Sequence, residues 1–216
     1  MGCDGFRRIR AWHRLTAFTV ASCLLALPAR GDIIDRVLAL AGGDLILLSD
    51  VQTVTIFGLL PDAPDETDAL TWLIDRTLTL AEVNRFIVAE PEAGVIDADL
   101  ADVRGRFSTP EEFQRALAAV GMTETELARV VRDNRRIDSY LRQRFGSALQ
   151  PTEAALARYY RDYVDRYSVG EVAASFDRVR AQVQRDLQEE RRQALIADWV
   201  DRLRLRATVI RLDEDE

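Results

Sequence analysis

The chain has 216 residues, of which 48% are hydrophobic and 30% charged, as in an ordinary globular protein. Its net charge is −7 and it has no lysine; an acidic surface of this kind disfavours nucleic acids and anionic membranes as partners. Both cysteines and the only histidine fall within the first 31 residues. The rest of the chain therefore lacks the side chains for a disulfide, a Cys/His metal site, a thiol nucleophile or a Ser-His-Asp triad.

Residues 1–31 have the pattern of a secretory signal peptide. Four arginines at residues 7–14 precede an apolar run over residues 15–27, and Ala29-Arg30-Gly31 supplies small residues where a signal peptidase reads. The run is shorter than the ~20 residues of a membrane-spanning helix. We expect cleavage after Gly31 and a periplasmic protein that meets the membrane only during export. Cleavage would remove five arginines and one aspartate and leave a net charge of −11.

Two alternatives to a cleaved signal remain open. The segment could be retained as an N-terminal anchor. Val20-Ala21-Ser22-Cys23 also resembles a lipoprotein signal in which Cys23 is lipidated, although the leucines continue past the cysteine, where a lipid-anchored chain is expected to turn polar.

The stretch "DRVLALAGGDLILLSDVQ", residues 35–52, predicts a β-hairpin followed by a helix. Two apolar strands turn at Gly42-Gly43, and Ser49 with Gln52 three residues on forms a capping box for a helix from Asp50 to about Leu60. Both strands are apolar at nearly every position, so both faces of the hairpin are expected to be buried. An isolated hairpin is marginal in water, so another segment must cover it.

Several amphipathic helices follow. Residues 66–86 place Leu70, Leu73, Ile74, Leu78, Ala81 and Phe86 at helical spacing, and Asp97 begins a short helix that runs to Arg106.

Three threonines mark the next helix starts. Thr109-Pro110 and Thr123, each with a glutamate three residues on, predict helices from Glu111 to Val120 and from residue 124 to Gly146. Pro151-Thr152 begins a further helix.

Residues 173–206 contain no proline or glycine, which predicts about 50 Å of continuous helix. Its proposed apolar face consists of Phe176, Val179, Val183, Leu187, Ala194, Trp199 and Leu203. The helix leads to the β-branched strand "ATVIRL", residues 207–212, the best candidate to pair with the N-terminal hairpin. The expected fold is mainly α with a small antiparallel sheet, three-stranded and built from both ends of the chain.

The order of these segments resembles a known family. A chain that begins "DIIDRVLALAGGDLILLSDV", continues through "LTWLIDRTLTLAEVNRFIV" and ends with "VRAQVQRDLQEERRQALIADWVDRLRLRATVIRL" is similar to SurA-type periplasmic chaperones, related to the parvulin-type peptidyl-prolyl isomerases. The resemblance covers essentially residues 32–216. It implies one chaperone domain with a helical body over 32–167 and a C-terminal helix and strand over 173–212.

The chain departs from this family where the isomerase domain would sit. Only "YSVGEV", residues 167–172, occupies that junction, and the histidines of a parvulin pocket have no counterparts after residue 31. The resemblance therefore implies a non-enzymatic chaperone that binds unfolded exported or outer-membrane polypeptides. We expect it to act without ATP, because the sequence has no phosphate-cradling glycine-rich loop, and without a cofactor or metal. The rival hypotheses are a scaffold subunit that holds one folded partner and a degenerate isomerase.

Candidate site residues come from the aromatic and sulfur-containing side chains. These could line an apolar groove for extended peptide or be core: Phe107, Phe113, Met122, Tyr159, Tyr160 and Tyr163. The acidic pairs Asp62/Asp65 and Glu189/Glu190 are interpreted as solvated charge rather than acid-base groups. Ser49 is interpreted as a helix cap, because no base is present to activate it.

Overall fold

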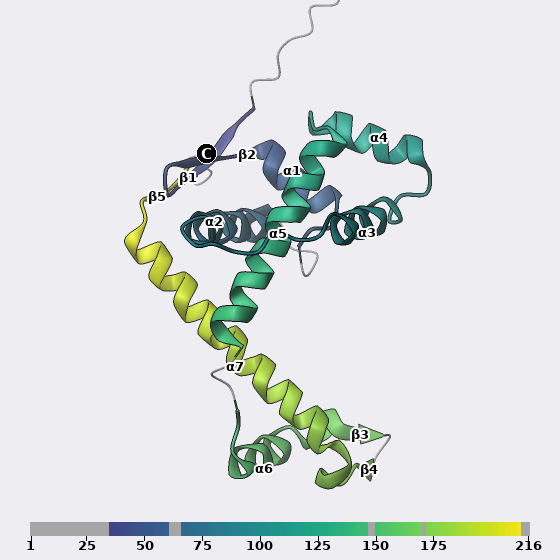
Figure 1. Ribbon diagram of the computed structural model, residues 1–216, viewed down its shortest axis with the longest axis vertical. Coiled ribbons are helices and arrows are strands. Elements are labelled where there is room, and N and C mark those ends of the chain that lie inside the picture. Colours follow the sequence, from purple (N-terminus) through teal and green to yellow (C-terminus); the bar gives the residue numbers. More distant parts are fainter. Residues whose placement is uncertain (1–34, 61–65, 147–149, 170–171, 213–216) are drawn as a thin grey trace, which may run out of the picture. The chain divides into compact units, whose positions relative to one another are not determined.

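The computed structural model describes residues 35–60, 66–146, 150–169 and 172–212. This part of the chain is mainly helical with a small antiparallel sheet, as expected (Figure 1). The predicted signal peptide, with Cys23 and the cleavage position after Gly31, lies outside the described residues. None of the helices that the structure describes combines the length and apolar composition needed to cross a bilayer.

The elements follow one another as β1 (Val37–Ala41), β2 (Asp44–Leu47), α1 (Leu48–Ile56), α2 (Glu66–Val83), α3 (Ala93–Arg104), α4 (Pro110–Ala119), α5 (Glu124–Phe145), α6 (Glu153–Asp162), the 3-10 helix η1 (Val164–Tyr167), β3 (Ser168–Val169), β4 (Val172–Ala173), α7 (Phe176–Arg206) and β5 (Val209–Arg211). The short β3–β4 hairpin at the junction before α7 is an element that the sequence did not predict.

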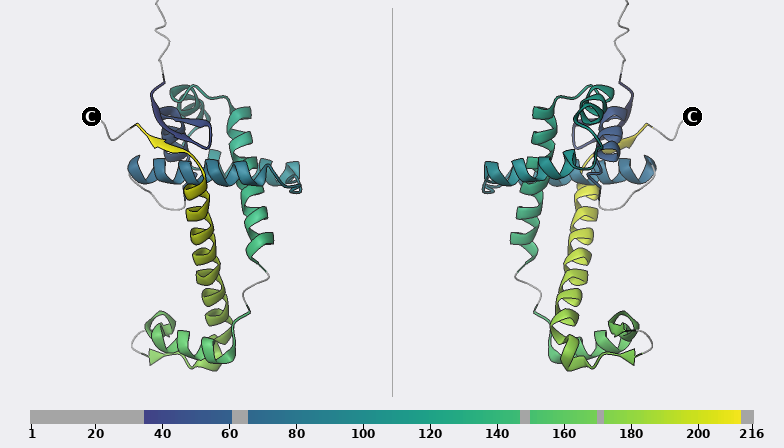
Figure 2. Two further views of the ribbon diagram at one scale, coloured as in Figure 1. Left: turned by 90° about the vertical axis from the view of Figure 1, so that its left-hand side faces the viewer. Right: turned by 90° about the vertical axis from the view of Figure 1, so that its right-hand side faces the viewer.

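The two ends of the chain form one sheet, which confirms the predicted pairing. The strand order is β2-β1-β5, and β5 pairs antiparallel with β1 (Figure 2). Leu40 lies opposite Ile210 in this pairing. Gly42 has a φ of 63° in the hairpin turn and donates its N–H to the carbonyl of Thr208 at 2.9 Å. A Cβ on Gly42 would also lie 3.2 Å from Leu78 of α2, so both backbone conformation and close packing favour glycine there.

The two faces of the sheet differ, although burial of both was expected. Ala39, Ala41 and Ile46 lie in the core with residues of α2. Leu45 is 58% exposed and Ile210 46% exposed, and both flank Leu40 on the opposite face. The third strand therefore extends the sheet but does not cover its second face.

Helix α1 begins differently from the prediction. Its N-cap is Leu47, whose N–H donates to the carboxylate of Asp50 at 2.9 Å. Ser49 lies inside the first turn, and its hydroxyl donates to the Asp35 carboxylate. Strand β2 runs directly into the helix, so the capping position moves two residues towards the N-terminus. The helix ends at Ile56 rather than at Leu60.

The three threonine caps are confirmed. The hydroxyls of Thr109, Thr123 and Thr152 each accept a hydrogen bond from the backbone N–H three residues on. Helix α3, however, begins at Ala93, four residues before the predicted Asp97. The three threonine signals thus located the starts of their helices, whereas the serine signal at Ser49 did not.

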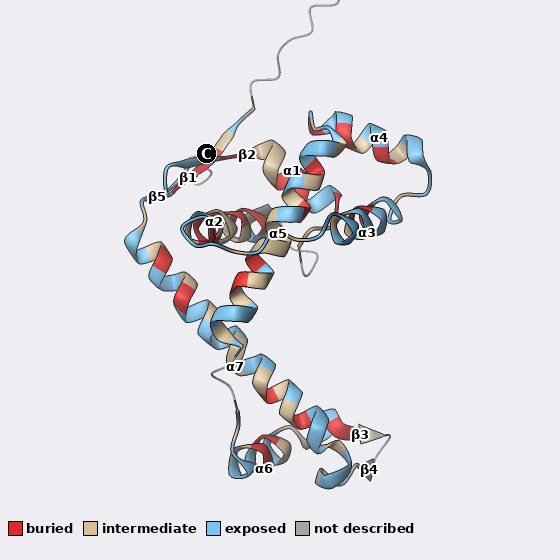
Figure 3. Cartoon of the chain, in the orientation of Figure 1, coloured by how far each residue is buried: buried red, intermediate tan, exposed pale blue. Residues whose placement is uncertain are grey.

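Helix α7 has 31 residues and two separate buried segments (Figure 3). Val183 and Leu187 are buried near its beginning, and Trp199 and Leu203 near its end. Ala194, predicted on the apolar face, is exposed, and no side chain from residue 188 to residue 198 is buried.

The buried side chains form three clusters. The sheet core joins β1, β2, α1 and α2 to the ends of α5 and α7. The phenylalanine core surrounds Phe57, Phe113 and Leu127 and joins the end of α1 to α3, α4 and α5. The tyrosine core surrounds Tyr159 and Tyr167 and joins α6 and η1 to the first half of α7.

Candidate functional site

The six predicted peptide-binding residues fall into two groups. The rings of Phe57, Phe107 and Phe113 contact one another in tilted or edge-on arrangements, with ring-centroid distances of 5.5 to 5.9 Å. Met122 packs against the same cluster. Phe113 is buried, but Phe107 and Phe113 both line an open hollow of about 510 Å³ beside the start of α4. These three residues therefore belong to the phenylalanine core and its opening.

The three tyrosines lie in the tyrosine core, and the structure does not bring them together with the phenylalanines. The Tyr159 hydroxyl donates to Glu190 at 2.8 Å, and the Tyr160 hydroxyl to the carbonyl of Ala174 at 2.6 Å. The guanidinium of Arg166 lies 4.1 Å from the ring centroid of Tyr163. These contacts are those of a structural cluster; peptide binding by any of the six residues stays a prediction.

Burial, together with polar contacts, shifts the pKa values of two tyrosines in this cluster. Burial, with the hydrogen bond to Glu190, raises the pKa of Tyr159 to about 12. Burial and the hydrogen bond to Asp186 raise the pKa of Tyr167 as well. Both shifts favour the protonated hydroxyl as a donor, so these tyrosines hold α6 and η1 against α7 rather than act as bases.

The acidic pairs interpreted as solvated charge have different surroundings. Glu189 pairs with Arg192 at 2.6 Å on the surface of α7, whereas Glu190 accepts the hydrogen bond from Tyr159. Asp62 and Asp65 lie outside the described residues. Within the described ranges, no group of three or more histidine, cysteine or acidic side chains is placed to hold a metal ion.

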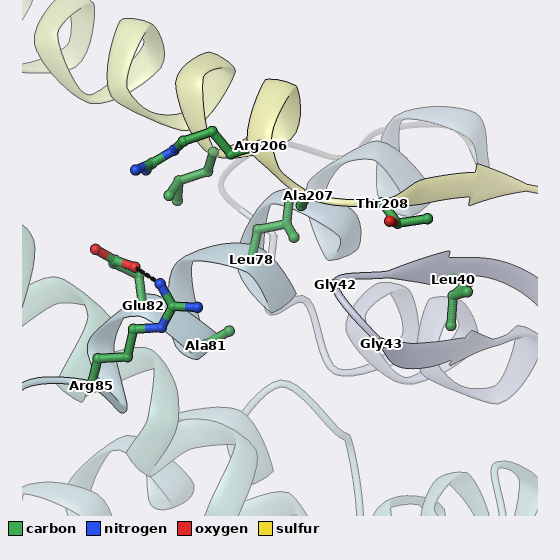
Figure 4. Close-up of a pocket in the computed structure, with 11 residues that line it drawn as sticks. Leu40, Gly42, Gly43, Leu78, Ala81, Glu82, Arg85, Arg206, Ala207 and Thr208 are labelled. Atoms are coloured by element: carbon green, nitrogen blue, oxygen red, sulfur yellow. Dashed lines mark hydrogen bonds and ion pairs between the residues drawn. The ribbon is translucent and has the colours of Figure 1, made fainter.

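A groove that the sequence did not predict lies between α2, α5 and α7. Three hollows of about 610, 340 and 330 Å³ adjoin one another, because Arg206 and Glu82 line both the first and second and Arg144 lines both the second and third. We call this surface the α2/α5/α7 groove. Figure 4 shows its first hollow, with Arg206 across from Glu82 and Arg85 and the hairpin turn at the other end.

Aromatic rings from three segments line the second and third hollows. The ring centroids of Trp199 in α7 and Tyr140 in α5 are 6.0 Å apart. The ring centroid of Tyr140 lies 5.5 Å from that of Phe86, a residue of the segment that follows α2. The guanidinium of Arg144 lies within 5.8 Å of the ring centroids of Tyr140, Phe145 and Trp199. The rings and the arginine brace one another, so this part of the groove is formed before any ligand arrives.

Three apolar side chains at the groove are exposed to solvent. Ile87 is fully exposed, Leu205 is 86% exposed and Phe86 is 48% exposed. The sequence placed Phe86 on the apolar face of the second long helix, but α2 ends at Val83, and Phe86 and Ile87 lie in the segment after it. The sequence contains a signal for this earlier end of the helix, because Phe86 and Ile87 come shortly before Pro91.

Positive charge dominates the lining of the groove. Four arginines and one glutamate line the three hollows, namely Arg85, Arg144, Arg202, Arg206 and Glu82. Glu82 is paired with Arg85 at 3.0 Å. The groove therefore combines exposed apolar side chains with an excess of guanidinium groups.

No protein-family model matches the chain, and no curated protein matches it. The groove and its charge are thus the features from which a function can be inferred.

Proposed function

We propose that the protein is an ATP-independent chaperone of the periplasm, which binds unfolded exported polypeptides, outer-membrane protein precursors among them, in the α2/α5/α7 groove. The observation that carries this proposal is the exposure of Ile87, Leu205 and Phe86 along an open groove lined by aromatic rings. Large apolar side chains gathered on a surface mark sites of interaction with other chains. The resemblance to SurA-type chaperones supports the same function.

The proposed mechanism is transient burial of apolar client segments. Unfolded chains aggregate through exposed apolar side chains, and a groove that covers them lowers the concentration of free aggregating segments. The groove is open along its length, so clients can leave by the route by which they enter. Weak binding of this kind requires no nucleotide-driven release step, and the sequence contains no phosphate-cradling glycine-rich loop.

The proposal includes the lack of isomerase activity. Between η1 and α7 the structure describes the two paired strands β3 and β4, and the sequence has eight residues there, too few for an isomerase domain. The protein should leave the cis/trans exchange of a proline peptide at its uncatalysed time of ~10–100 s. Acceleration of this exchange would support the degenerate-isomerase hypothesis instead.

The test is aggregation, measured by light scattering after dilution from denaturant. The clients are an unfolded outer-membrane β-barrel protein and two unrelated proteins, citrate synthase and reduced lysozyme. Stoichiometric protein should delay the aggregation of all three. Ile87→Ser and Leu205→Ser should weaken this effect several-fold, because each removes an exposed apolar contact from the groove.

Matched controls separate the groove from apolar surface in general. Leu195→Ser changes a leucine on the same helix as Leu205, 37% exposed and outside the groove, and Val95→Ser changes an exposed valine of α3. Both controls should protect clients as well as the wild type does. An equal loss of client protection in the groove variants and the control variants would exclude the groove as the client-binding site. Protection of one client alone would favour the scaffold hypothesis.

A further inference from the structure

We propose that the α2/α5/α7 groove selects apolar segments that carry aspartate or glutamate side chains, an inference that rests on the proposed function and specifies its substrate class. The first observation is a contrast in charge. The whole chain has a net charge of −7, with 36 acidic residues against 29 arginines. The groove lining reverses this ratio, with four arginines and one glutamate.

Two of these arginines have no carboxylate partner among the residues that the structure describes. The Nε of Arg206 donates to the carbonyl of Arg202 in its own helix at 3.1 Å. The Nη1 of Arg144 donates to the hydroxyl of Tyr140 at 3.1 Å. By contrast, Arg85 is paired with Glu82 and Arg202 with Asp198. Arg144 and Arg206 thus retain guanidinium N–H groups for a ligand.

These two arginines flank the apolar middle of the groove. The second hollow contains Trp199 and Leu205, and both Arg144 and Arg206 line it. An extended segment with an aromatic or aliphatic side chain against the exposed Leu205 can therefore place a neighbouring carboxylate against either arginine. Guanidinium groups bind carboxylates through paired, charge-assisted hydrogen bonds, so aspartate or glutamate beside the apolar residue strengthens binding and lysine weakens it.

The test uses three short fluorescein-labelled peptides that share a Leu-Phe-Leu centre and are flanked on both sides by glutamate, glutamine or lysine. Fluorescence anisotropy at low salt should show the glutamate peptide binding about tenfold more tightly than the glutamine peptide, and the lysine peptide more weakly than both. The preference should shrink at 1 M salt, where charges are screened within ~3 Å.

A pair of substitutions assigns the preference to the groove. Arg206→Gln should reduce the glutamate-to-glutamine preference about threefold and leave binding of the glutamine peptide unchanged. Arg115→Gln is the matched control, because Arg115 is also exposed and donates its Nε to the carbonyl four residues earlier in its helix, but lies outside the groove. It makes the same change in net charge and should leave the preference intact.

Each other outcome overturns the inference in a distinguishable way. Equal binding of the glutamate and glutamine peptides would refute carboxylate selection while leaving the chaperone function in place. Binding of none of the peptides, together with no protection of clients, would refute both. Displacement of the glutamate peptide by a single-stranded oligonucleotide at low concentration would show that the arginines serve phosphate rather than carboxylate groups.

Discussion

The sheet core and the tyrosine core are joined by the same helix, α7, but are stabilised in different ways. The sheet core is largely aliphatic and gathers segments from residue 38 to residue 203. The tyrosine core has five buried residues, all between 156 and 187, and two of them are tyrosines bonded to carboxylates of α7. A core built from segments far apart in the sequence forms only when most of the chain is folded. A small core built from neighbouring segments gains much of its order from polar contacts.

The stretch of α7 between the sheet core and the tyrosine core explains how the two cores can be stabilised separately. From residue 188 to residue 198 no side chain of α7 is buried. The helix there is supported by its own hydrogen bonds, by surface ion pairs such as Arg192 with Glu189, and at its first turn by the hydrogen bond from Tyr159 to Glu190. The two cores should therefore respond separately to substitution, and four predictions test this.

The largest effect is expected from Trp199→Ala. Trp199 is 3% exposed and contacts Tyr140 and Phe145, so its truncation leaves a large cavity in the sheet core and should cost about 3–5 kcal/mol. Denaturant unfolding measures the loss. Trp199→Phe should lose much less, and equal losses for the two variants would show that ring packing at this position contributes little.

A matched pair on α7 tests the independence of the two cores. Leu187 and Leu203 are each 7% exposed, the first in the tyrosine core and the second in the sheet core. Leu187→Ala should cost about 2–5 kcal/mol of local stability and abolish hydrogen-exchange protection over residues 153–187 only. Leu203→Ala should instead reduce protection in β1, α2 and the end of α7. Loss of protection throughout the chain in both variants would show one cooperative unit.

Alkaline pH should open the tyrosine core before the sheet core. The pKa of Tyr159 is raised to about 12 from its ordinary value of 10. A raised pKa means that the protonated hydroxyl contributes stability that is complete below pH 10 and is lost as pH rises towards 12. Tyrosinate absorbance and circular dichroism should therefore change together in this range. Tyr159→Phe should remove part of this pH dependence; an unaltered alkaline transition would contradict the assignment.

The smallest effect is expected from the ion pair between Glu153 of α6 and Arg180 of α7. The hydrogen bond from Arg180 lowers the pKa of Glu153, so the pair contributes stability above the ordinary pKa of a glutamate and loses it as pH falls. Glu153→Gln should lower the melting temperature slightly at pH 7 and not at pH 3. Asp99→Asn, which breaks a pair with Arg135 between α3 and α5, should leave protection of residues 153–187 unchanged.

Much of the fold could be predicted because its signals are local. A threonine followed three residues later by glutamate caps a helix through its own side chain, as at Thr109 and Thr123, whatever lies around it. The pairing of β5 with the hairpin was predictable for another reason: the hairpin needed a partner, and one β-branched strand followed the long helix. The sequence did not indicate which hairpin strand, β1 or β2, would be the partner.

The candidate site could not be predicted in the same way. The sequence identifies Phe86, Tyr140 and Trp199 as apolar, but spacing along a helix does not show which of them faces another element. Their contacts depend on where α2 ends and on how α5 and α7 approach each other. The same limit explains why the predicted tyrosines and phenylalanines separated into two cores.

The sequence by itself determined the order of the helices, the three threonine caps and the closure of the sheet, but not the bounds of α1, α2 and α3. Capping hydrogen bonds and periodicity act over a few residues, and the closure follows from a hairpin that lacked a partner strand. Which apolar side chains are exposed to solvent was decided only by the tertiary structure. Leu205 and Leu203 lie two positions apart on α7, yet one is 86% and the other 7% exposed, because helical geometry turns them to different sides and only one side meets the sheet core. The charge of the groove is likewise a tertiary property, since its arginines come from α5, α7 and the segment after α2.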